Sequence, residues 1–254
     1  MIKQLRTIRF HVIVICFAIL FTGCAEDRAL RERQAQAKRN LGKSFLADAN
    51  FTAGLKELLD AAELDPMNPE IHNELALTYR EMEMHSQAIS HFNKAIELKP
   101  DFSEAHNNLG TVYLMLGDWD RAIASFKKAL SNNRYTTPHF AHNNLGLAYF
   151  NKGQFETATE SFLKAIQGQP SFSRAYHNLG VAYEAMNEWD KALEAYQESI
   201  RHAPDDPRSH FRLGKLYLRL NNRPLAIEKL EEAIRLDKTN VIAPEAKGLL
   251  EKIR

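Results

Sequence analysis

Cysteine, glycine and proline are scarce in this sequence, and their scarcity excludes several classes of fold. The 254 residues include 2 cysteines, 11 glycines and 9 prolines. Two cysteines cannot form a disulfide scaffold in a chain of this length, and the glycines and prolines are too few for the many tight turns of a β-sandwich. We therefore expect an all-α protein.

Motifs that bind metals, nucleotides or nucleic acids are missing as well. There is no CxxC pair, no Cys/His quartet, no GxGxxG and no P-loop. The 33 basic and 32 acidic residues give a net charge of +1, which provides no electrostatic reason to expect a nucleic-acid partner. Nothing resembles a nucleophile with its base. We therefore predict a protein that is not an enzyme and that has no cofactor, metal or small-molecule substrate.

A long apolar run is also absent, but a short one stands near the N-terminus. Three basic residues within the first nine precede the apolar run 10–21, which only His11 interrupts. This run has about 12 residues, whereas a membrane-spanning helix needs about 20. Basic residues followed by a short apolar run and small residues are typical of a secretory signal. We predict that residues 1–23 are a signal peptide that is removed, which leaves 30 basic and 32 acidic residues in the mature chain.

The end of this segment resembles a bacterial lipobox. Small residues precede Cys24 in the junction Phe21-Thr22-Gly23-Cys24, although Phe21 stands where the lipobox pattern favours leucine. The resemblance implies that Cys24 is acylated, for example with palmitate, and becomes the mature N-terminus. Ala25 then implies sorting to the periplasmic face of the outer membrane. The alternatives are a signal without lipidation and an uncleaved anchor.

The rest of the chain is an internal repeat. A leucine followed by a small residue recurs at spacings of 34, 34, 36, 34 and 34. We call these six leucines the repeat leucines. An aromatic residue stands four positions after each of them, and small residues stand 13 and 20 positions after. The repeat leucines are Leu41, Leu75, Leu109, Leu145, Leu179 and Leu213.

This pattern resembles the tetratricopeptide-repeat (TPR) family over residues 35–240. The resemblance implies an α-solenoid, a right-handed superhelix of six helix-turn-helix units, in which each unit buries its apolar face only against its neighbours. Gly117, Gly153, Asn187 and Asn221 stand where the turn of a unit needs a left-handed residue. The predicted division is an anchor segment at 24–34, repeats at 35–68, 69–102, 103–138, 139–172, 173–206 and 207–240, and a capping helix at 241–254.

One repeat boundary is irregular. The spacing of 36 lies between Leu109 and Leu145, and Arg134 replaces the proline that closes four of the other units. A two-residue insertion changes the rotation between neighbouring units, so we expect it to divide the solenoid into two halves of three repeats. With the lipobox and the six repeats, the insertion resembles the type IV pilus pilotin family (PilF/PilW/Tgl).

The pilotin resemblance implies an outer-membrane lipoprotein that helps the pilus secretin to localise or to form multimers. The alternative is a general periplasmic TPR scaffold that tethers envelope or polysaccharide-assembly proteins. The resemblance also implies that a protein segment binds in the groove lined by the first helix of each unit. Plain consensus packing and binding on the convex face are the competing interpretations.

Asparagines one or two positions before the repeat leucines could contact a peptide backbone, and apolar residues on the same helix faces could form a partner site. Charge along these faces changes from Glu70, Glu74 and Glu81 to Arg208, Arg212, Lys215 and Arg219, which could orient a bound segment. The predicted protein-binding residues are Asn107, Asn108, Leu114, Met115, Phe140, Asn143, Asn144, Leu147, Phe150, Asn178 and Val181.

Histidines three positions before four repeat leucines could suggest a metal site. Equivalent positions of adjacent units lie a whole helix pair apart, about two interaxial distances of 8–10 Å. Zinc ligands must all lie about 2 Å from one ion. We therefore predict packing roles for His72, His106, His142 and His210.

Overall fold

The computed structural model describes residues 27–253. The predicted signal peptide, Cys24 and Ala25 therefore lie outside the described residues. The described part consists of helices and their connections, with no strand, which confirms the all-α class. None of its helices is both long and apolar enough to cross a membrane.

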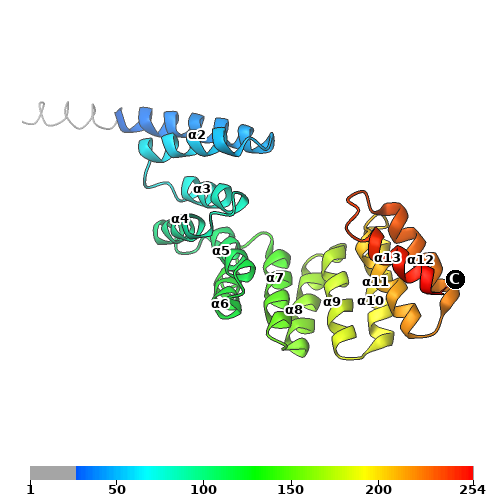
Figure 1. Cartoon of the computed structure of the whole chain (residues 1–254). Helices are drawn as coiled ribbons and strands as arrows, with labels where there is room; N and C mark the ends of the chain where they lie inside the picture. Colours follow the sequence, from blue (N-terminus) through cyan, green and yellow to red (C-terminus); the bar gives the residue numbers. More distant parts are fainter. Residues whose placement is uncertain (1–26, 254) are drawn as a thin grey trace, which may run out of the picture. The chain divides into compact units, whose positions relative to one another are not determined.

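The described part begins with the first of two compact units, which extends to Ala105. A helix at 27–47 runs through most of the predicted anchor segment into the predicted first repeat. The elements that follow in unit 1 are α2 (Phe51–Leu64), α3 (Pro69–Glu81) and α4 (His85–Leu98), which Figure 1 shows from blue to cyan-green.

Unit 1 is held together by an apolar cluster between successive repeats. Leu58 and Ala61 of α2 pack against Ile71 and Leu75 of α3, and none of the four has exposed surface. The repeat leucine Leu75 therefore lies against the second helix of the preceding repeat. Because burying a leucine side chain contributes about 1.5–3 kcal/mol, this leucine joins one repeat to the next.

The repeat leucine of the first repeat lacks this neighbour. Leu41 is 44% exposed, whereas Leu75 is fully buried. Because the leucine packs on the preceding repeat, and no helix of the described residues precedes the one at 27–47, its side chain remains open to solvent.

The second unit runs from residue 106 to the C-terminus. Antiparallel helix pairs follow one another in it, as Figure 1 shows for α7 to α12. Its elements are α5 (Ser103–Met115), which begins just before the boundary, α6 (Trp119–Leu130), α7 (Pro138–Asn151), α8 (Phe155–Gly168), α9 (Ser173–Ala185), α10 (Trp189–His202), α11 (Pro207–Arg219), α12 (Arg223–Leu236) and α13 (Ala243–Ile253).

Small residues allow the two helices of one repeat to approach closely. A Cβ atom at Gly146 would lie 2.5 Å from Cε1 of Phe162, whose ring is fully buried. Gly180 and Tyr196 repeat the arrangement at 2.6 Å in the next unit. The glycine after the repeat leucine therefore leaves the space that an aromatic ring of the second helix fills.

The turns inside the repeats need a left-handed residue. Gly117, Gly153, Asn187 and Asn221 all have positive φ, between 58° and 75°, which confirms the sequence prediction. In unit 1 the equivalent turns use Ala49 and Glu83, with φ of 55° and 59°. Side chains with a Cβ are strained there by about 1–2 kcal/mol.

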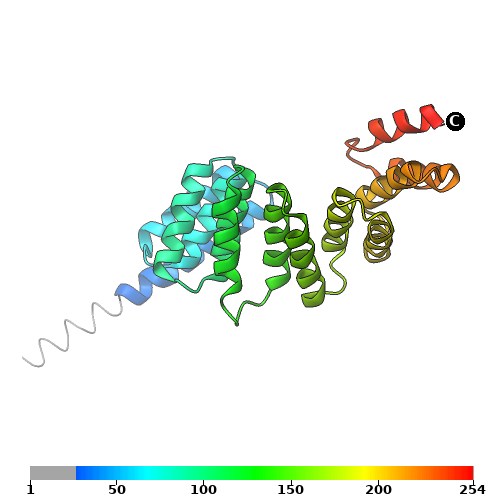
Figure 2. The same cartoon turned by 90° about the horizontal axis from the view of Figure 1, so that it is seen from below.

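The last helix covers the end of unit 2. Leu230 and Ala233 of α12 pack against Ala246 and Leu250 of α13, and Figure 2 shows α13, in red, beside α12, in orange. The Asp237 carboxylate accepts hydrogen bonds from the backbone N–H groups of residues 242 and 243, at 2.6 and 2.8 Å. These bonds stabilise the ionised carboxylate and lower the pKa of Asp237 to about 2.

The boundary between the two compact units does not fall at the insertion, so these units are not the expected halves of three repeats. The boundary lies between Ala105 and residue 106. The inserted segment is instead absorbed by packing, because the Tyr135 ring is buried against Ala129 of α6 and Ala141 of α7. An ion pair between Lys152 and Asp120 at 2.6 Å also joins the two repeats.

Candidate functional site

The predicted binding residues lie on the first helices of the repeats, and in unit 2 their asparagines form a hydrogen-bonded ladder. Asn144 on α7 donates from Nδ2 to Oδ1 of Asn107 on α5, at 3.2 Å. Asn178 on α9 donates in the same way to Asn143 on α7, at 2.8 Å. A weaker contact of 3.4 Å from Asn143 to Asn144 joins the two steps.

The ladder follows one rule of position. The residue directly before a repeat leucine bonds to the residue two places before the repeat leucine of the preceding unit. Unit 1 obeys the same rule with an ion pair, because Arg39 binds the Glu74 carboxylate through Nε at 2.9 Å and Nη2 at 2.7 Å. Residues at these two positions therefore couple successive repeats, through amide hydrogen bonds in unit 2 and through an ion pair in unit 1.

The hydrogen bonds between repeats occupy amide groups of some asparagines that could otherwise bind a peptide. Asn143 is 1% exposed and Asn107 is also buried, so both amides face neighbouring helices. Asn108, Asn144 and Asn178 are half-buried and keep part of their side chains at the surface. We call the groove-lining side of the first helices the inner face. The structure thus places two of the five predicted asparagines inside the repeat contacts and three at the edge of the inner face.

Two of the predicted apolar residues are exposed. Met115, at the end of α5, is 57% exposed, and Phe140, in the first turn of α7, is 41% exposed. The Phe140 ring lies 4.3 Å from the ring of His139 and 5.3 Å from that of Phe172, between ring centroids. Phe140 thus belongs to a small aromatic cluster at the start of α7.

The other predicted apolar residues are half-buried. Leu147 and Phe150 pack on the cluster that contains Phe162, and Val181 packs on the cluster around Tyr196. Leu114 is also half-buried. These side chains hold repeats together, and Met115 and Phe140 are the two that present most apolar surface to a partner.

The predicted charge gradient is largely paired within the protein. Glu70 and Glu74 contact Lys99 and Arg39. Arg212 lies 3.6 Å from Glu184, and Lys215 lies 2.9 Å from Glu245. Arg208 pairs with Asp206, and the Arg219 guanidinium stacks 4.1 Å above the Trp189 ring. Because each of these charges is already in an ion pair or stacked on an aromatic ring, the charge gradient has less effect on the orientation of a ligand than the sequence indicates.

The sequence patterns did not reveal a buried polar network in unit 2. His177 Nδ1 and Ser199 Oγ each lie 2.8 Å from Ser209 Oγ, and Ser199 donates to the backbone carbonyl of residue 173. Each hydroxyl has one proton, so the network is satisfied when His177 Nδ1 donates. Burial, assisted by the positive charge of Arg208, lowers the pKa of His177 to about 4. Ser199 replaces the alanine of most repeats, which is the sequence signal that could have indicated the network.

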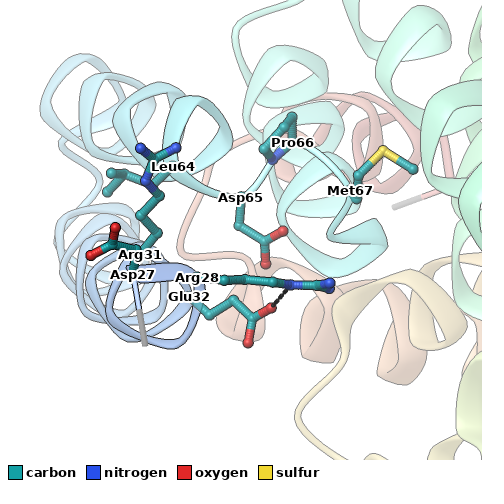
Figure 3. A pocket seen from close by; sticks show the side chains of 8 residues that line it. All are labelled: Asp27, Arg28, Arg31, Glu32, Leu64, Asp65, Pro66 and Met67. Carbon is teal, nitrogen blue, oxygen red and sulfur yellow. Dashed lines mark hydrogen bonds and ion pairs between the residues drawn. The ribbon is translucent and has the colours of Figure 1, made fainter. Parts of the chain in front are cut away.

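Unit 1 has a surface pocket of its own. It measures about 480 Å³ and lies between the helix at 27–47 and the connection from α2 to α3 (Figure 3). Arg28 and Glu32 form an ion pair of 2.8 Å at its edge, and Met67 contributes an exposed side chain. An exposed pair of this kind contributes about 0–1 kcal/mol. Within residues 27–253, no three or more histidine, cysteine or acidic side chains are grouped so that they could hold a metal ion.

Comparison with family models identifies the class of protein. Tetratricopeptide-repeat models match residues 70–134, 173–206 and 207–240, and a further TPR repeat model matches 146–187. The chain is therefore a TPR protein with an α-solenoid fold, which is a scaffold for interactions between proteins. No curated protein sequence matches it significantly.

Several solved structures share this fold. PilW, described as a widely conserved type IV pilus biogenesis factor, is 22% identical with a TM-score of 0.77, over 85% of this chain and 98% of PilW. PilF of Pseudomonas aeruginosa is 19% identical with a TM-score of 0.75, over 86% of this chain and 99% of PilF. YrrB, described as a TPR protein with an unusual peptide-binding site, is 21% identical with a TM-score of 0.56, over 75% of this chain and 97% of YrrB.

Proposed function

We propose that this protein is an outer-membrane lipoprotein and a type IV pilus biogenesis factor of the pilotin kind. Its partner is the pilus secretin or another pilus component, and its role is to help that partner to localise or to form multimers. The observation that carries the proposal is a fold match over nearly the whole length of both PilW and PilF. The resemblance of the junction before Cys24 to a lipobox and the insertion before the fourth repeat support it from the sequence.

The decisive experiment is deletion of the gene in the source bacterium. We expect SDS-resistant multimers of the secretin to disappear from the outer membrane and to return when the full-length gene is supplied. Normal secretin multimers after deletion would exclude the pilotin role. Capture of polysaccharide- or peptidoglycan-assembly enzymes without secretin would instead support the general scaffold.

The lipid anchor has a separate test. Two acyl chains bury enough CH₂ groups, at about 0.8 kcal/mol each, to hold a protein stably on a membrane. We expect the Cys24→Ala variant to fractionate as a soluble periplasmic protein, and the Cys16→Ala variant to behave as the wild type. Outer-membrane fractionation of Cys24→Ala would disprove anchoring through this cysteine.

Partner contact through the inner face can be tested with exposed side chains. Met115 and Phe140 present apolar surface, whereas Leu147 and Phe150 support the packing of their repeats. We expect the Met115→Glu/Phe140→Glu variant to keep its helicity and to lose most partner binding. The Leu220→Glu variant, changed at an exposed leucine directly after the end of α11 in unit 2, provides the control. Unchanged binding by the double variant would exclude this face.

A further inference from the structure

Beside the repeat boundary that carries the two-residue insertion, unit 2 has a cavity that the patterns of the sequence did not indicate. The cavity has a volume of about 310 Å³, at the lower end of the range for ligand pockets. It lies between α6, α7 and α8 and opens to solvent. Its lining consists of Lys127, Leu130, Ser131, His142, Leu145, Tyr149, Thr157, Glu160, Ser161 and Lys164.

The insertion changes the bonding of the histidine in this cavity. In two regular repeats the equivalent histidine bonds through Nε2 to the carbonyl of the closing proline, His72 to Pro66 at 3.0 Å and His210 to Pro204 at 2.9 Å. Before the fourth repeat the proline is replaced and the chain is two residues longer. Within residues 27–253, His142 makes no such bond, whereas its buried Nδ1 lacks a hydrogen-bond partner just as Nδ1 of His210 does.

The cavity is apolar inside and basic at its edge. Leu130, Leu145 and the Tyr149 ring provide its apolar surface. The Lys127 ammonium lies 5.7 Å from the centroid of the Tyr149 ring, and Lys164 is close enough to lower the pKa of His142 together with burial. In the described part of the chain neither lysine has an ion-pair partner. Two ammonium groups against the one carboxylate of Glu160 leave the edge positive.

The cavity does not belong to the inner face described above. His142, Leu145 and Tyr149 follow one another at helical spacings of three and four residues on α7. Asn144 and Leu147 lie about half a turn away from them around the same helix, at 100° per residue. The cavity and the inner face therefore use opposite sides of α7, and each can be changed without the other.

We propose that this cavity is a second protein-binding site, which holds one large apolar side chain of an acidic, extended segment of a partner protein. The apolar side chain enters between Leu130, Leu145 and Tyr149, and acidic residues beside it pair with Lys127 and Lys164. An anchor residue in a desolvated pocket usually carries much of the binding energy of such contacts, and complementary charges beside it contribute specificity and speed association. The proposal goes beyond the function proposed above, because it does not depend on which pilus or envelope protein provides the segment.

Photo-crosslinking in cells tests this site directly. The full-length chain carries p-benzoylphenylalanine in place of Tyr149, and the adducts formed on irradiation are identified by mass spectrometry. We expect one protein segment in which a large apolar residue stands beside at least two acidic residues. The same probe in place of Leu220, an exposed leucine directly after α11, is the control and should not give this adduct. No protein adduct, or an adduct with a neutral or basic segment or with lipid or glycan, would overturn the proposal.

Charge reversal then tests the role of the lysines. We expect Lys127→Glu/Lys164→Glu to reduce the adduct by about tenfold or more, since like charges now meet. Lys128→Glu/Lys247→Glu has the same change in net charge at two exposed positions outside the cavity and should leave the adduct intact. Circular dichroism checks the fold, and Lys127→Gln/Lys164→Gln replaces the first variant if that one does not fold. An adduct of undiminished yield in the folded variant would contradict the site.

The two proposals fail in different ways. Met115→Glu/Phe140→Glu should weaken partner binding at the inner face but keep the adduct at position 149. If the adduct disappears in that variant and persists in the lysine variant, the cavity is not an independent site. If gene deletion leaves the secretin unchanged while the acidic segment still crosslinks, the pilotin role fails and the cavity proposal stands.

Discussion

Single residues with positive φ show where unit 1 differs from unit 2. At the equivalent turn, Glu83 in unit 1 carries a side chain, whereas Gly153 in unit 2 does not, although both residues are left-handed. Glu83 is exposed, so its strain is not compensated by burial. At the turn of the second repeat, Glu83 is therefore less favourable for stability than the glycine that stands at the same turn of other repeats.

We expect Glu83→Gly to increase the free energy of unfolding by about 1 kcal/mol, because relief of the strain exceeds the gain in unfolded-state entropy. Gly153→Ala should decrease it by a similar amount, and no atom lies within 4 Å of the added Cβ, so the effect is that of the backbone alone. Urea denaturation of both variants checks the prediction. A destabilised Glu83→Gly protein would show that the side chain contributes more than its conformation costs.

The half-buried His177 makes the stability of unit 2 depend on pH. Its pKa is about 4 in the folded protein, below the ordinary value of 6.5, because burial disfavours the charged imidazolium. The unfolded state thus binds the proton first as the pH falls. The contribution of His177 is complete above about pH 6.5 and is lost as the pH falls to about 4.

We expect the wild type to lose on the order of 3 kcal/mol through this group between pH 7 and pH 4. Carboxylates lose stability over part of the same range, so the wild type is compared with His177→Asn, which keeps a polar atom toward Ser209. The difference in free energy of unfolding between the two proteins should shrink or reverse toward pH 4. A difference that is constant with pH would contradict a neutral, half-buried His177.

At the scale of elements, the asparagine ladder couples α7 to α9. Asn143 and Asn178 share a hydrogen bond of 2.8 Å, and Asn143 is 1% exposed. Removal of either amide leaves a polar group without its partner in the contact between the helices. We expect each alanine substitution to cost about 1–3 kcal/mol.

A double-mutant cycle separates coupling from the single effects. We expect Asn143→Ala and Asn178→Ala to be non-additive by about 1 kcal/mol, because both break the same bond. Asn143→Ala and Asn222→Ala should be additive, since Asn222 caps α12 and belongs to another part of unit 2. An additive Asn143/Asn178 pair would show that this hydrogen bond contributes nothing to coupling between the repeats.

At the scale of the whole molecule, a solenoid transmits a local change mainly to its neighbours. The chain has two compact units, with the boundary after Ala105, so we expect a change in one unit to affect mainly that unit. Leu75 joins two repeats of unit 1, whereas the equivalent Leu41 has no preceding repeat in the described part of the chain and is partly exposed.

We expect Leu75→Ala to cost about 2–5 kcal/mol and Leu41→Ala about 1 kcal/mol, because the second side chain was not fully removed from water. Hydrogen exchange should show that Leu75→Ala reduces protection in α2 and α3 and leaves α9 and α11 unchanged. Equal loss of protection in all four helices would mean that the chain unfolds as one cooperative body.

The sequence by itself determined the period of the fold. Helix order, the six repeat leucines and the left-handed turns at Gly117, Gly153, Asn187 and Asn221 follow from local spacing, because a helix and its turn depend on residues close in the chain. The class of protein also follows from these residues.

Tertiary structure decided what each repeated position does. Nothing local distinguishes Asn143, which is buried in the ladder, from Asn144, which keeps surface, because the difference arises from the neighbouring repeat. The insertion is visible in the sequence, but the release of His142 from a proline carbonyl and the cavity beside it depend on how α6, α7 and α8 pack. Spacing along the chain determines the faces of the helices, and the distances between repeats determine which of those faces remain open to a partner.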